Sequence, residues 1–143
     1  MVRQSAVVNQ DRPFRHSHEL QPDNPALMNN VAFLLASENR NMDEALQLAQ
    51  QAIGKAPQNP EYQDTLAWVY IQKGMPQNAI PILSAVLQGS PNQAEYHFHL
   101  ATALAVTGKT PEARNELRLA LANRPTQEER AGIQALMSRL GVS

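Results

Sequence analysis

Several common features are missing from this sequence, and each absence excludes a class of protein. There is no cysteine, so disulfide bonds and thiolate metal sites are excluded. The net charge is −1, without the positive balance that nucleic-acid-binding proteins normally carry, so we expect no nucleic-acid partner. The longest apolar runs are far shorter than a membrane span, so no membrane insertion is expected. The first residues also lack the apolar core of a signal peptide.

What the sequence does contain is an internal period of 34 residues. A shift by this length superposes apolar, glycine and proline positions on one another. The coincident pairs are Leu66 and Leu100, Ala67 and Ala101, Gly74 and Gly108, Ala79 and Ala113, Leu83 and Leu117, and Pro91 and Pro125. A third copy lies upstream, with one extra residue between Leu35 and Ala45. A fixed period of this length is typical of a helical solenoid.

Local signals divide the chain after residue 23 into seven expected helices. Asn-Pro pairs predict helix starts at 24–25 and 59–60, and Gly74 and Gly108 predict helix ends. Capping boxes are expected at Asn41, Ser90 and Thr126, each followed by Glu or Gln three residues later. No segment of appreciable length alternates as a strand would, so the fold class is all-α. Alanine recurs where a larger side chain would hold two helices apart.

The repeated positions identify a resemblance to a known family. The second copy has Gln63-x-x-Leu66-Ala67-x-x-Tyr70 and the third His97-x-x-Leu100-Ala101-x-x-Leu104. These motifs resemble the tetratricopeptide repeat (TPR). The resemblance implies a right-handed α-solenoid of three helix-turn-helix repeats, at residues 25–59, 60–93 and 94–127, with a capping helix at about 127–140. The repeat domain would span 22–143, and residues 1–21 would be a mostly disordered tail or the remnant of a preceding repeat.

A finer likeness concerns the segments 64–68 and 96–100. They resemble the C-terminal repeats of long bacterial repeat proteins linked to exopolysaccharide and envelope assembly. Under that hypothesis the chain is a fragment of an exported protein and a periplasmic location is open. A complete chain without a signal peptide is expected in the cytoplasm.

The family implies a functional surface on the first helix of each repeat, where a concave groove holds partner peptides. Helical geometry turns a set of residues toward this face. The candidate groove residues are Asn29, Phe33, Glu61, Asp64, Trp68, Gln72, Glu95, Phe98 and Thr102. Their mixture of aromatic and acidic groups favours a basic or apolar peptide. The alternative is that the aromatic side chains only complete the packing between first helices.

The predicted function is a non-catalytic scaffold or adaptor that binds a partner protein or peptide. The alternative is a structural module that acts mainly by weak homo-oligomerisation through ends of opposite charge. No catalytic, cofactor or metal site is expected, because no Ser–His–Asp set, paired carboxylates or glycine-rich phosphate loop is recognisable. His97 and His99 are two residues apart and so cannot form the one-face pair that a helical metal site uses.

Overall fold

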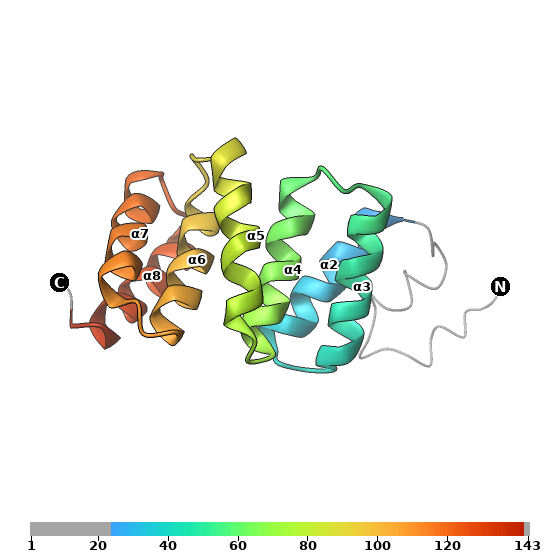
Figure 1. Cartoon of the computed structure of the whole chain (residues 1–143), viewed down its shortest axis with the longest axis horizontal. Coiled ribbons are helices and arrows are strands. Elements are labelled where there is room, and N and C mark those ends of the chain that lie inside the picture. Colours follow the sequence, from blue (N-terminus) through green and yellow to red (C-terminus); the bar gives the residue numbers. More distant parts are fainter. Residues whose placement is uncertain (1–23, 142–143) are drawn as a thin grey trace.

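The computed structural model describes residues 24–141, which contain helices and no strand. The predictions made for residues 1–21 therefore lie outside the described residues. The helices of this part are α2 (Pro25–Ser37), α3 (Met42–Lys55), α4 (Pro60–Gln72), α5 (Pro76–Gly89), α6 (Ala94–Val106), α7 (Thr110–Ala122) and α8 (Gln127–Arg139). Figure 1 shows them as successive hairpins along one axis. The predicted all-α solenoid is confirmed, while the boundaries of the individual repeats stay a prediction.

Side-chain caps start three of the helices where the sequence predicted them. Asn24 accepts a hydrogen bond from the backbone N–H of Leu27, and Asn59 accepts from Glu61 and Tyr62. Proline follows each asparagine at the first helical position, where a missing N–H costs nothing. At α8 the capping box is complete, with Thr126 and Glu129 bonding reciprocally to each other's backbone.

Two predicted capping boxes are wrong. Asn41 precedes α3 in a left-handed conformation, with φ of 46°, and its side chain makes no cap bond. Ser90 lies at the end of α5, and α6 begins only after Gln93, which also makes no cap bond. Asn41 lacks the extended backbone of a helix cap, and Ser90 lies too far before the start of α6 at Ala94 to cap it. The glycine stops are confirmed, because Gly74 and Gly108 both have φ of 83°, which L residues rarely adopt.

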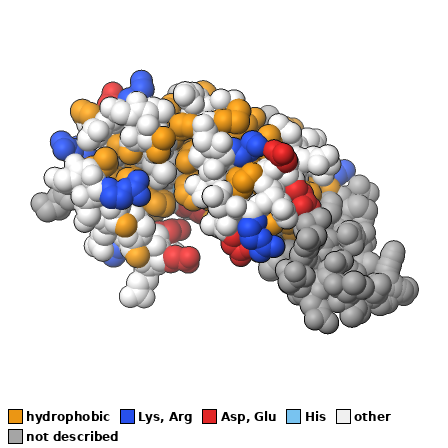
Figure 2. All heavy atoms as spheres, turned by 90° about the horizontal axis from the view of Figure 1, so that it is seen from below, with side chains coloured by type: hydrophobic (Ala, Val, Ile, Leu, Met, Phe, Trp, Pro, Cys, Tyr) orange, Lys and Arg blue, Asp and Glu red, His pale blue; other side chains and the backbone are white. Residues whose placement is uncertain are grey.

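The order of helix contacts explains the shape. Consecutive helices pack as the pairs α2–α3, α4–α5 and α6–α7, and α2–α4, α4–α6 and α6–α8 also touch. Within residues 24–141, α3 does not contact α5, and α5 does not contact α7. The first helices are therefore closer together than the second helices, which bends the array so that α2, α4, α6 and α8 lie on the inner side. Figure 2 shows this part as an arch, hollowed along its lower edge.

Alanine makes the close helix packing feasible. Six alanines at equivalent positions of the three pairs are 0% exposed: Ala32, Ala45, Ala67, Ala79, Ala101 and Ala113. Larger residues at these sites would force the helices apart. Leu83, Leu117 and Ile133, also 0% exposed, fill the spaces between successive pairs. None of the helices in residues 24–141 has the length and apolar content needed to cross a membrane.

Candidate functional site

The inner side of the arch carries a hollow of about 450 Å³. Three consecutive first helices contribute to its wall. The lining residues are Asn29, Asn30, Phe33 and Leu34 from α2, Glu61, Asp64 and Thr65 from α4, and Glu95 from α6. Five of the predicted groove residues thus meet here: Asn29, Phe33, Glu61, Asp64 and Glu95. In Figure 2, Asp and Glu side chains gather around the hollow lower edge.

A buried pair of charged side chains lies beside this hollow. Asp64 on α4 and His99 on α6 are 2% and 3% exposed, and His99 Nδ1 lies 2.8 Å from Asp64 Oδ1. On the other side of the ring, His99 Nε2 lies 3.9 Å from a carboxylate oxygen of Glu95. The imidazole therefore sits between two carboxylates, one of them fully buried. This arrangement joins neighbouring inner helices.

Burial and the neighbouring charges shift the pKa values of His99, Glu95 and Tyr96. Complete burial by itself disfavours the imidazolium, but the Asp64 carboxylate and then Glu95 outweigh it and raise the pKa of His99. Burial raises the pKa of Glu95, against the opposing effect of His99 and with a further contribution from Asp64. Burial, followed by Asp64, Glu61 and Glu95, raises the pKa of Tyr96 to about 12. The carboxylates of the hollow thus act together as a negative site.

The two C-terminal aromatic residues of the predicted groove are engaged in packing. The Trp68 ring stacks on His99 with centroids 4.3 Å apart, and its centroid lies 6.5 Å from that of Phe98. Trp68 also packs against the core around α2–α3 and the core around α5–α6. Phe98 lies against α8, so close to Gly132 that an added Cβ there would be 3.0 Å from the ring. These contacts support the packing alternative for both residues, whereas Phe33 lines the hollow.

Gln72 and Thr102 also have structural partners. Gln72 Nε2 donates to the carbonyl oxygen of Ala36, which ties the end of α4 to α2. The Thr102 hydroxyl donates to the carbonyl of Phe98 within α6. Neither residue lines the hollow. On α4 and α6 the wall is therefore formed by residues of the N-terminal half of each helix.

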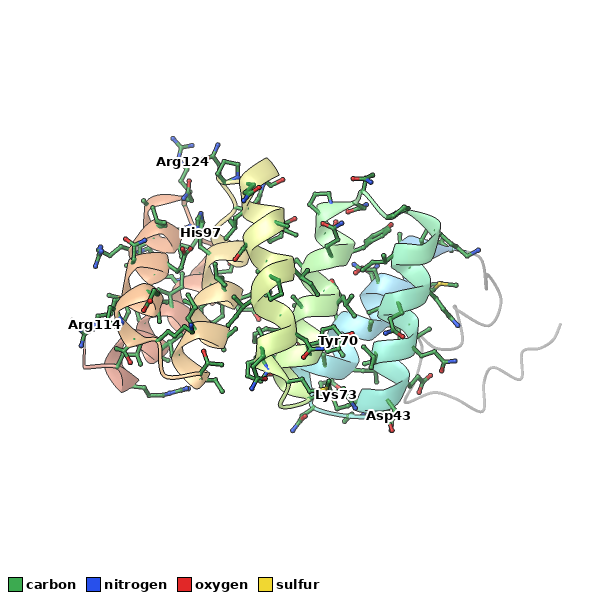
Figure 3. The ribbon with its side chains drawn as sticks, in the orientation of Figure 1. Asp43, Tyr70, Lys73, His97, Arg114 and Arg124 are labelled. Atoms are coloured by element: carbon green, nitrogen blue, oxygen red, sulfur yellow. The ribbon has the colours of Figure 1, made fainter. Side chains whose placement is uncertain are left out.

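Other polar contacts tie the outer helices to the inner ones. His97 on α6 lies 2.7 Å from Glu116 on α7 through Nδ1 and 2.7 Å from the Pro91 carbonyl through Nε2. Lys73 Nζ lies 2.7 Å from Asp43 Oδ1, linking the end of α4 to the start of α3. Figure 3 labels His97 on α6 and places Lys73 and Asp43 side by side. These contacts are away from the hollow and serve to fix the helix pairs.

Sequence reasoning missed the Asp64–Glu95–His99 cluster. Among residues 24–141, these three form the group whose ligand atoms, all within 4.8 Å of one another, could hold a metal ion. The raised pKa of His99 means that a proton competes with a metal for its ring nitrogen. One signal could have revealed the cluster: Asp64 and His99 are 35 residues apart, close to one repeat period, so they lie on adjacent first helices.

Comparison with known proteins places this geometry in a family. Residues 70–140 match the family model described as tetratricopeptide repeat. No curated protein sequence matches the chain. The solved structure of TTC0263, a thermophilic TPR protein in Thermus thermophilus, is 20% identical, has a TM-score of 0.78 and aligns over 98% of this chain and 79% of its own.

Two further structures have the same fold. Pseudomonas aeruginosa pilF is 19% identical, with a TM-score of 0.64 over 91% of this chain and 67% of its own. MamA AMB-1 is 22% identical, with a TM-score of 0.61 over 96% of this chain and 85% of its own. The hypothesis of a link to exopolysaccharide assembly finds no support among these relatives. The repeat model thus identifies residues 70–140 as tetratricopeptide repeats, and the helical array of the described residues has the fold of tetratricopeptide repeat proteins.

Proposed function

We propose that this chain is a non-catalytic scaffold or adaptor that holds a peptide segment of a partner protein in the hollow of α2, α4 and α6. A TPR fold supports protein–protein interaction in general, and proteins of this family are generally non-catalytic. The observation that supports this particular site is the concave wall, to which three consecutive inner helices contribute. A hollow that spans several repeats suits a ligand that extends across them.

The chemistry of the wall favours a particular kind of peptide. Phe33 and Leu34 offer apolar surface on one side, and Glu61, Asp64 and Glu95 offer carboxylates on the other. Apolar side chains of the peptide would supply burial, while basic side chains would set its orientation and speed its association. An acidic segment would meet like charge. A basic peptide with apolar anchors is the ligand class that fits.

The test begins with a random decapeptide library displayed on phage and selected against the full chain. The best peptide is then titrated into isotopically labelled protein, and amide shifts map its footprint. We expect shifts concentrated in α2, α4 and α6. Asn30→Arg, at an exposed position of the wall, should weaken binding about tenfold or more by filling the hollow with a bulky cation.

The matched control is Gln47→Arg, which adds the same group at an exposed position of α3, on the outer side. It should leave the affinity unchanged. Equal effects of the two variants, or a footprint confined to α3, α5 and α7, would overturn the proposed site. If no peptide binds the inner helices but sedimentation shows dimers that weaken with salt, the self-assembly alternative is favoured instead.

A further inference from the structure

Within residues 24–141, the wall of the hollow has carboxylates but no cationic side chain to balance them. Its charged lining residues are Glu61, Asp64 and Glu95, and among the described residues no lysine or arginine contributes to the wall. Asp64 is already paired with His99. Glu61 is exposed at the rim, and the side chain of Glu95 is 37% exposed, so both carboxylates are open to a ligand. The hollow thus has more negative charge than its own residues balance.

A second observation, independent of the acids, is an unpartnered amide in the same wall. Asn29 is only 3% exposed, yet its Oδ1 has no hydrogen-bond partner within the described part of the chain. A buried carbonyl oxygen without a donor destabilises the free protein. Asn29 also lines the hollow, and a half-turn about its last side-chain bond, which has a broad torsional preference, would let the amide oxygen accept a hydrogen bond from a ligand there.

From these groups we infer that the hollow is a specificity pocket for one arginine side chain of the bound peptide, held by Glu61, Glu95 and Asn29. This inference rests on the proposed function and adds the ligand's chemistry to it. A guanidinium has five N–H donors in a planar fork, so it can serve two carboxylates and an amide oxygen at once. A lysine ammonium is a compact point charge and matches spread acceptors less well.

The protonation behaviour of the wall agrees with a cationic occupant. Burial raises the pKa of Glu95, so the charged carboxylate is disfavoured while the hollow holds only solvent. A bound guanidinium would reverse this effect by supplying the missing opposite charge. The volume of about 450 Å³ leaves room for the side chain together with neighbouring peptide backbone. An arginine would therefore supply the opposite charge that the Glu95 carboxylate lacks.

The experiment uses the peptide selected from the phage library and three versions of it. In these the arginine is replaced by citrulline, which has the same shape without the charge, by lysine or by glutamate. Calorimetric titration into the full chain should show that the citrulline peptide binds about tenfold or more weakly than the arginine peptide. The glutamate peptide should bind more weakly than the citrulline peptide. The lysine peptide should have an affinity between those of the arginine and citrulline peptides. Glu95→Gln should reduce the preference for arginine over citrulline to about twofold or less.

Glu112→Gln, which removes the same charge from an exposed position of α7, is the control and should keep the full preference. Selected peptides that lack arginine, or bind equally with citrulline, would overturn the pocket while a footprint on α2, α4 and α6 still supports the proposed function. Absence of any inner-side footprint would overturn both. A parallel titration with zinc chloride in the absence of peptide tests whether the Asp64–Glu95–His99 cluster binds a metal ion instead. Saturable zinc binding that Glu95→Gln abolishes, together with no preference for arginine peptides, would assign the cluster to a metal.

Discussion

Asp64 and His99 form a 2.8 Å hydrogen bond between carboxylate and imidazole, with both side chains almost wholly removed from water. The bond joins α4 to α6, and therefore connects the inner helices of successive pairs. Because Asp64 also lines the hollow, the same pair that stabilises the array sets the position of one wall. Stability and the shape of the candidate site are linked through these two residues.

Removal of one partner of this pair should be costly. Asp64→Ala would leave a buried imidazole without its carboxylate, and we expect the free energy of unfolding to fall by about 3–5 kcal/mol. The double variant Asp64→Leu, His99→Leu removes both polar groups and should lose clearly less than the sum of the single variants Asp64→Leu and His99→Leu. Urea unfolding followed by circular dichroism measures all four variants. Asp43→Ala, which breaks the exposed contact with Lys73, is the control and should change little; an equal loss there would contradict the assignment.

Stability should depend on pH through His99. Its pKa is raised in the folded protein above the ordinary value of 6.5, so the pair's contribution is complete below about 6.5 and is lost as pH rises through the higher folded value. The facing groups that set this shift are Asp64, Glu95 and Glu129. Urea midpoints should therefore decline from about pH 6 toward alkaline pH, and Asp64→Asn should flatten that decline.

Tryptophan fluorescence gives a second readout of the same titration. Trp68 is the sole tryptophan and its ring stacks 4.3 Å from that of His99. A protonated imidazole quenches indole fluorescence more strongly than a neutral one. Emission should rise around the folded pKa of His99, at the alkaline end of the pH interval in which the urea midpoint falls. A flat profile in the native protein would show that His99 does not titrate there.

Glu95 should destabilise the ligand-free protein at neutral pH, although it contributes to ligand binding. Its raised pKa means that folding favours the protonated carboxyl, so the charged form destabilises the fold at neutral pH. Glu95→Gln is expected to keep or raise the Tm at pH 7, and this gain should shrink as pH falls toward 4, where wild-type Glu95 takes up its proton. Differential scanning calorimetry at both pH values measures the effect, with Glu112→Gln as the exposed control. A fall of several degrees at pH 7 would mean that Glu95 is mainly a stabilising partner of His99.

The close packing of helix pairs predicts a different kind of sensitivity. Ala79 is 0% exposed in α5 and lies in a cluster of buried apolar side chains, so Ala79→Asp would bury a carboxylate among apolar groups. We expect loss of cooperative unfolding or a destabilisation above about 4 kcal/mol. Ser84→Asp adds the same group at an exposed position of the same helix and should leave the melting curve almost unchanged. Identical melts for the two variants would contradict the packing of α5 against its neighbours.

Much of the fold was predictable because its signals are local. An Asn-Pro pair specifies a helix start within a few residues, as at Asn24 and Asn59, and a glycine after the last turn specifies a stop. The failures at Asn41 and Ser90 have a local cause as well. Whether a polar side chain caps a helix depends on the backbone angles of the loop, and residue types alone do not determine those angles.

The candidate site was only partly predictable, because it depends on how successive pairs are offset in space. Helical periodicity turns Asp64 and Glu95 toward the inner side, where both line the hollow. It could not show that α4 and α6 approach closely enough to bury Asp64 against His99, or that α8 would cover Phe98. These outcomes follow from the tilt between neighbouring helices, which is set by the whole array of small contacts.

Trp68 allows the packing and binding roles of the aromatic residues to be separated. Its ring is half-buried, stacks on His99 and touches the core on both sides, while its Nε1 has no hydrogen-bond partner among the described residues. Trp68→Ala should therefore lower the free energy of unfolding by about 3 kcal/mol, near the low end for large aromatic truncations. Trp68→Phe keeps an aromatic face on the imidazole and removes the unpaired N–H, so it should lower the free energy of unfolding much less.

Urea unfolding and affinity for the selected peptide are measured on both variants. If Trp68→Ala unfolds at the wild-type midpoint yet binds peptide weakly, the ring acts as an anchor for the ligand and the packing assignment is wrong.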